Sequence, residues 1–168
     1  MALSMYQASV PAFVQMLTAL SNILDKAAAF AAAKKVDPTV LLNSRLAPDM
    51  FPLTRQIQIG ADFAKGPMAR LAGLEVPKYD DNETTIDALK ARIAKTLDYV
   101  KSFKPEQIDG SETRAINLTV GGQPLTLTGQ DYLVNFALPN FYFHATTAYA
   151  ILRHCGVAIG KRDFMARS

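Results

Sequence analysis

The residue types that could do chemistry concentrate near the C-terminus, in residues 139–157, PNFYFHATTAYAILRHCGV. Asn140 and His144 are four residues apart, so on a helix they project from the same side, one turn above the other. They could contact one ligand, or they could be hydrogen-bonded inside the protein. Pro139 precedes them, and a proline in a helix removes one hydrogen bond and bends the helix. Such a bend could open a pocket, and it could equally let a long helix wrap around its core.

The histidines by themselves do not predict a metal centre. His154 follows His144 by ten residues, which on a helix separates the two side chains by about 80° and about 15 Å along the axis. They cannot bind the same ion. Zinc requires three or four nitrogen, sulfur or carboxylate ligands, so one histidine with one asparagine is a poor site.

Four segments with helical periodicity would have to position these residues, because their apolar side chains recur at steps of three and four. They span residues 5–33, 49–71, 84–103 and 128–156. In the first, Pro11 is tolerable only near a helix start, so we expect the regular part to begin around Ser9. Thr84 and Thr128 each precede an aspartate by three residues, and we expect both threonines to cap the helices that follow.

A two-residue period replaces the helical one between Thr113 and Thr128, on both sides of the sequence GGQP. This pattern predicts a short β-hairpin. A lone hairpin is marginal in water, so we expect it to pack on the helices. Four helices with one small hairpin before the last helix predict an all-α four-helix bundle.

Length and composition are those of one globular domain spanning residues 1–168, with 49% hydrophobic and 20% charged residues. The single cysteine, Cys155, excludes an internal disulfide and fits a reducing compartment, so we expect a cytoplasmic protein. No secretion signal and no run of about 18 apolar residues occurs, so no membrane association is expected.

Charge gives little support for nucleic acid as a partner. The formal net charge is +3, and the basic residues are scattered along the chain. Their only concentration, GKRDFMARS at residues 160–168, is typical of a solvated tail. We therefore expect no nucleic-acid binding.

Two stretches of the sequence resemble a bacterial domain-of-unknown-function family, DUF1993. They are RLAPDMFPLTRQIQIGADFAKGPMARLAG at residues 45–73 and LPNFYFHATTAYAILRHCGVAIGKRDF at residues 138–164. The similarity spans nearly the whole chain, including the hairpin. That family is grouped with the DinB and YfiT-like four-helix bundles, many of which hold a divalent metal through three histidines. One of these comes from the second helix and two, four residues apart, come from the fourth.

Carried over by position, the resemblance leaves one of the three metal ligands in place. His144 keeps the ligand type, and the leucine, arginine and glycine of the DinB pattern follow it as Leu152, Arg153 and Gly156. Asn140 and Gln56 stand at the two other ligand positions. Amide oxygens are weak ligands for zinc or nickel, so the resemblance implies a degenerate metal site.

A polar cluster of Gln56, Asn140 and His144 would then lie in an apolar bundle, satisfied by mutual bonds, water or a ligand. Arg55 and Tyr142 could line its rim. The first functional hypothesis is a small-molecule-binding or structural module. The alternative is a metal-dependent hydrolase or thiol transferase in which His144 is a metal ligand or general base; no catalytic residue is assigned.

A homodimer is also expected. It is typical of related bundles, and apolar side chains point in several directions around the last helix, as at Phe141, Phe143 and Tyr149. A helix that is apolar all round needs cover on every side.

Overall fold

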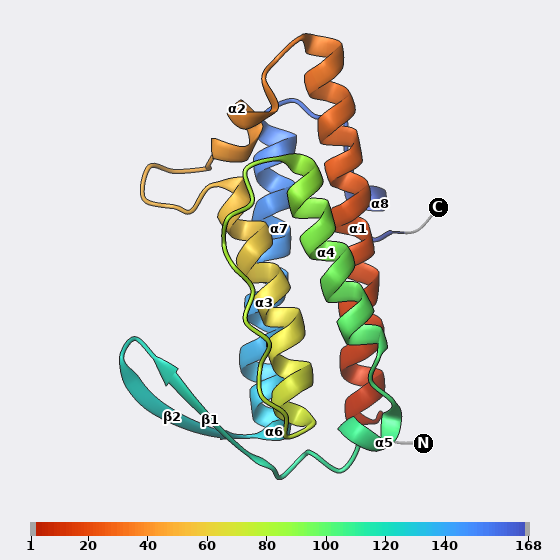
Figure 1. Ribbon diagram of the computed structural model, residues 1–168, viewed down its shortest axis with the longest axis vertical. Coiled ribbons are helices and arrows are strands. Elements are labelled where there is room, and N and C mark those ends of the chain that lie inside the picture. The colour runs from red at the N-terminus through yellow and green to blue at the C-terminus, as the bar shows by residue number, and fades with distance from the viewer. Residues whose placement is uncertain (1–2, 167–168) are drawn as a thin grey trace.

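The computed structural model describes residues 3–166, and its body is a bundle of four long helices (Figure 1). They are α1 (Met5–Lys34), α3 (Leu53–Leu71), α4 (Ile86–Lys101) and α7 (Leu138–His154). Each helix packs against two others, in the pairs α1 with α4, α4 with α3, α3 with α7 and α7 with α1. The predicted all-α four-helix bundle is confirmed.

The helix directions leave a long connection to be made between α3 and α4. In Figure 1, α1 and α7 run upward, whereas α3 and α4 both run downward. Residues 72–85, which contain no helix or strand, therefore return along the length of the bundle before α4 begins. A connector of this length without secondary structure is uncommon in a compact domain and must be held in place by its own contacts.

Side chains from all four helices form one apolar core. Phe13 on α1 meets Phe141 on α7 edge to face, with the ring centroids 4.9 Å apart. Other fully buried core residues include Leu17, Leu20, Ile23, Leu24, Leu53, Ile57, Met68, Leu71 and Leu89. Within residues 3–166, no helix is both long and apolar enough to cross a membrane.

The starts of the helices differ from the predicted ones by a few residues. α1 begins at Met5, capped by Ser4, with Pro11 inside the helix. Pro11 and Gln7, whose carbonyl loses its helical partner, are both exposed, so water can replace the missing bond. α3 begins at Leu53, and Thr85 caps α4 by accepting a hydrogen bond from the amide of Ala88 at 3.1 Å.

Three short helices have no counterpart in the periodicity, because one or two turns are too short to show it. They are α2 (Pro38–Asn43), α5 (Pro105–Ile108) and α8 (Lys161–Phe164). α8 packs against α1, where Lys26 pairs with Asp163 at 2.6 Å. The expected solvated tail is therefore docked on the bundle up to residue 166, while Arg167 and Ser168 lie outside the described residues.

The last helical run changes its winding before α7. Thr128 caps it as expected, accepting from the amide of Asp131 at 3.3 Å. A short α6 (Gly129–Asp131) leads into a π-helix, η1 (Tyr132–Ala137), which continues directly into α7. π-helical turns are rare and often occur at functional sites. Sequence periodicity did not indicate this one.

The predicted hairpin is confirmed as β1 (Ala115–Val120) paired antiparallel with β2 (Gln123–Thr128). Gly121 and Gly122 form its two-residue turn with φ of 55° and 79°, a left-handed conformation that favours glycine. The hairpin packs most closely on the helices at its base: Ile116 is 3% exposed, whereas Val120, next to the turn, is 43% exposed. In Figure 1 the hairpin extends outward from the lower end of the bundle.

Candidate functional site

His144 on α7 faces Gln56 on α3, as the alignment of these positions predicted. The Nδ1 atom of His144 lies 2.7 Å from Oε1 of Gln56, and His144 is 9% exposed. The ring of Phe63 lies nearly parallel to the imidazole, with centroids 6.0 Å apart and an interplanar angle of 14°. The ring of Phe143 is perpendicular to the same imidazole, with centroids 5.2 Å apart. The histidine is thus enclosed by one amide and two aromatic rings.

The amide of Gln56 determines which nitrogen of His144 carries the proton. Its Nε2 donates to the carbonyl of Phe51 at 3.0 Å, so its Oε1 faces the imidazole and can only accept. Nδ1 of His144 must therefore donate, which leaves the lone pair on Nε2. Burial lowers the pKa of His144, and the positive charge of Arg55 lowers it further. The imidazole is neutral at physiological pH.

Asn140 does not join this pair. Its Nδ2 donates to the carbonyl of Phe136, in the π-helix, at 2.7 Å. Pro139 is the second residue of α7, two positions after the π-helix ends at Ala137, so its missing backbone N–H lies at the change of winding. The proline and the asparagine thus belong to the transition between two helical windings, and the predicted cluster of three consists of one pair and one separate residue.

The two residues expected at the rim lie apart from His144. Tyr142 is exposed on the outer side of α7. Arg55 turns toward the connector, where it pairs with Asp81 and donates to Oε1 of Gln58 at 3.3 Å. Of the five residues proposed from the sequence, the structure joins only Gln56 and His144 directly.

The side chains around His144 do not fit a zinc or nickel ion. Over residues 3–166, no three histidine, cysteine or carboxylate side chains gather in a metal-binding group. His144 offers one nitrogen lone pair, on Nε2, and Gln56 presents an amide oxygen, which is a weak ligand for either metal. In this geometry Gln56 orients the histidine and is not placed as a ligand.

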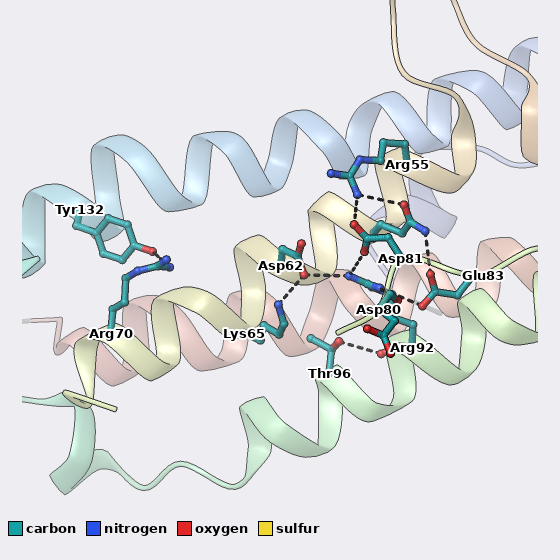
Figure 2. Close-up of polar contacts among 11 residues, drawn as sticks. Arg55, Asp62, Lys65, Arg70, Asp80, Asp81, Glu83, Arg92, Thr96 and Tyr132 are labelled. Atoms are coloured by element: carbon teal, nitrogen blue, oxygen red, sulfur yellow. Dashed lines mark hydrogen bonds and ion pairs between the residues drawn. The ribbon is translucent and has the colours of Figure 1, made fainter. Parts of the chain in front are cut away.

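A second polar centre, which sequence reasoning missed, surrounds Arg92 on α4 (Figure 2). The Arg92 side chain is 2% exposed, and its Nη1 contacts Oε1 of Glu83 at 3.0 Å and the carbonyl of Asp80 at 3.1 Å. Its Nη2 lies 3.0 Å from carboxylates of both Asp62 and Asp81. Three acidic groups therefore converge on one buried guanidinium.

This Arg92 network joins the connector to α3 and α4. Gln58 on α3 donates to Glu83 at 2.8 Å, and Lys65 on α3 pairs with Asp62 at 2.6 Å. Burial alone would raise the pKa of Glu83, but hydrogen bonds from Gln58 and Arg92 outweigh it and hold the pKa below its ordinary value. The connector carries the remaining acidic partners, so the network holds residues 72–85 against the bundle.

The sequence did contain one signal for Arg92. It lies three residues after Leu89 and one before Ile93, on the apolar face of α4. A charged residue on a buried helix face needs partners, because charges are almost never buried alone.

A cleft opens between the hairpin, α3 and the π-helix, with a volume of about 340 Å³. Its lining residues are Asp62, Phe63, Lys65, Arg70, Val76, Leu118, Thr119, Val120, Tyr132 and Phe136. Phe63 lines the cleft and also stacks on His144, so the cleft and the polar pair share one wall. The volume is within the range of small-molecule sites.

Because His144 is buried against Gln56, we predict that the free energy of unfolding depends on pH. Because the folded protein holds the pKa of His144 below its ordinary value of 6.5, the unfolded chain binds a proton more readily. The contribution of neutral His144 to the free energy of unfolding should be fully present above pH 6.5, and it should be lost as the pH drops below that value. We expect urea unfolding to show a loss between pH 7.5 and 5.5 that the His144→Gln variant lacks. An equal loss in both proteins would assign the effect to other groups.

Three comparisons with known proteins bear on this geometry. A family model for a domain of unknown function, DUF1993, matches residues 5–165. A 1.83 Å crystal structure of a DinB family member protein from Shewanella denitrificans is similar, with a TM-score of 0.87 and 47% sequence identity, covering 95% of this chain and 90% of that chain. No protein with a curated description matches this chain.

Proposed function

This chain belongs to the DUF1993 family and has the fold of a DinB family member, and from that premise we propose that it is a small-molecule-binding module. The observation that carries the proposal is the cleft of about 340 Å³ beside the His144–Gln56 pair. Phe63, Tyr132 and Phe136 supply aromatic walls, and Arg70 and Lys65 supply polar groups. Concave sites that combine aromatic walls with placed polar groups are typical of ligand sites.

In this proposal His144 and Gln56 lie outside the cleft and hold Phe63, one of its walls, in position. The hydrogen bond to Gln56 fixes the imidazole ring, and the fixed ring stacks on Phe63. Phe63 also lies 6.0 Å from Phe136 between ring centroids, so the position of one cleft wall depends on the polar pair. A ligand site on rigid helices needs such supporting contacts to keep its shape.

The experiment is a fragment screen by ligand-observed NMR on the untagged protein and on a variant with a filled cleft, Val120→Trp. We expect fragments that bind the parent to be lost in the variant, because the indole occupies the space between the hairpin and α3. Ala94→Trp, on the exposed face of α4, is the matched control and should retain them. Hits that survive Val120→Trp would place ligand binding elsewhere.

The alternative of a metal-dependent hydrolase or thiol transferase has less support. It would require His144 as a metal ligand or base, and the groups around His144 offer one imidazole and one amide oxygen. His144 is also absent from the cleft lining. Its unprotonated Nε2 could accept a proton, but no nucleophile adjoins it among the contacts described.

We also propose that the protein forms a homodimer. Large apolar side chains are exposed on one helical run, at Val134, Tyr142 and Phe143, and on the loop before α3, at Leu46 and Phe51. Exposed apolar groups of this size favour cover by another chain. Light scattering at micromolar concentration should give twice the chain mass of 18.3 kDa, and a monomer mass would remove the proposal.

A further inference from the structure

The cleft contains one cation that no carboxylate neutralises. Lys65 pairs with Asp62 at 2.6 Å, and Asp62 also contacts Arg92. Arg70, at the end of α3, has no carboxylate partner in the described part of the chain; its Nη1 donates to the hydroxyl of Tyr132 at 3.1 Å. Figure 2 shows Arg70 and Tyr132 apart from the acidic groups around Arg92. A guanidinium has five N–H donors, so most of those on Arg70 are available.

The hydroxyl of Tyr132 does not neutralise the positive charge of Arg70. Tyr132 is almost fully buried, and burial raises the pKa of its hydroxyl although Arg70 partly opposes this. The phenol therefore stays neutral at physiological pH. It positions the guanidinium by one hydrogen bond and supplies no negative charge.

Gly66 gives the Arg70 side chain the space that it occupies. A Cβ atom at position 66 would lie 2.7 Å from Nη1 of Arg70, closer than side chains tolerate. The absence of a side chain one turn earlier thus lets the guanidinium fold back along α3 toward Tyr132. Tyr132 thus positions the cation at the wall of the cleft, and Gly66 leaves it room.

The remaining lining is mainly apolar and aromatic, with Phe63, Phe136 and Leu118 facing the same space. We infer that the cleft binds a small organic acid, whose carboxylate contacts Arg70 and whose apolar body lies against the aromatic walls. Arginine suits this role because its planar donors match a carboxylate in a bidentate pair. The inference rests on the proposed function, since it assigns the ligand class of the same cleft.

The test compares phenylacetate with its neutral isostere phenylacetamide by NMR titration. For the parent protein we expect the acid to bind about tenfold or more tightly than the amide, as one charge-assisted hydrogen-bond pair provides. Arg70→Met should abolish this preference, and Arg70→Lys should retain part of it, because lysine keeps the charge but loses the planar fork. Arg153→Met, which removes an exposed arginine at the end of α7, should leave the preference unchanged.

Gly66→Ala provides a second variant that leaves every charge in place. The added methyl group should displace the guanidinium and weaken phenylacetate binding while phenylacetamide binding stays the same. Circular dichroism of each variant would establish that it is folded.

The outcomes separate this inference from the proposed function. Equal binding of acid and amide by the parent, or a preference that persists in Arg70→Met, would overturn the ligand class. If neither probe binds while other fragments still occupy the cleft, the ligand class is also overturned. The proposed small-molecule-binding function would then remain, with a different class of ligand. If no fragment of any charge binds in a Val120-dependent way, the proposed function itself fails.

Discussion

Replacing Arg92 by methionine is expected to lower the free energy of unfolding by about 3 kcal/mol. Methionine fills much of the same volume, so the packing of α4 is largely kept while the charge is removed. Asp62, Asp81 and Glu83 would then face one another without the cation between them. Breaking a buried ion pair by removing one partner costs about 3 to 5 kcal/mol. We take the low end because Asp62 and Asp81 are partly open to solvent, which screens them.

Arg55→Met is the matched control for this experiment. Arg55 pairs with Asp81 in the same region, but its side chain is 37% exposed, against 2% for Arg92. Exposed pairs contribute at most about 1 kcal/mol, so this variant should be close to the parent in urea unfolding. Equal losses for the two variants would contradict the view that burial of Arg92 makes it the centre of the network.

A second variant tests whether the loss comes from uncompensated negative charge. Adding Glu83→Gln to Arg92→Met removes one of the three carboxylates and should recover part of the stability. Because Glu83 and Arg92 contact each other, their effects should not add. Additive losses would show that the two residues stabilise the protein independently.

Changing Gln56→His and Asn140→His together is expected to raise the affinity for zinc or nickel by a factor on the order of 100 or more. The parent offers one imidazole, whose Nδ1 is engaged by Gln56 at 2.7 Å. Position 140 precedes His144 by one turn on the same helix, and position 56 faces it from α3. Three imidazoles would then meet the ligand count of an open zinc site.

Calorimetric titration with each metal measures this gain, and the same double variant carrying His144→Ala is its control. Loss of most of the gain in the control would show that His144 is the third ligand. Equal metal affinity in the parent and the double variant would contradict the interpretation of Gln56 and Asn140 as replaced ligands. Asn140 now bonds the carbonyl of Phe136, so the new histidine must turn from that direction to bind the ion.

The helices and the hairpin could be predicted from the sequence because their signals are local. Apolar side chains at steps of three and four gave the four long helices, and Gly121 with Gly122 gave the turn between two alternating strands. The same spacing argument placed Asn140 one turn from His144. The boundaries moved by a few residues because the choice of cap depends on a single hydrogen bond, as at Thr85.

The role of each polar residue depended on contacts that spacing does not contain. Gln56 and His144 are 88 positions apart, and only the packing of α3 on α7 makes Gln56 an acceptor for Nδ1 of His144. Asn140 shares the helical side of His144, yet the π-helix before it offers a nearer carbonyl at Phe136. Local periodicity cannot show a change of winding of this kind.

The sequence by itself therefore determined the helices, the hairpin and the presence of a polar group on the last helix, since each follows from the order of neighbouring residues. Tertiary structure alone decided the course of residues 72–85, because this segment has no periodicity. Asp81 and Glu83 hold it along the bundle through their contacts with the buried Arg92. Tertiary structure also decided the cleft, whose walls come from α3, the connector, the hairpin and the π-helix. Such contacts join segments that are distant in the sequence, so they exist only once the chain has folded. A charge such as that of Arg92 requires partners only when folding buries it.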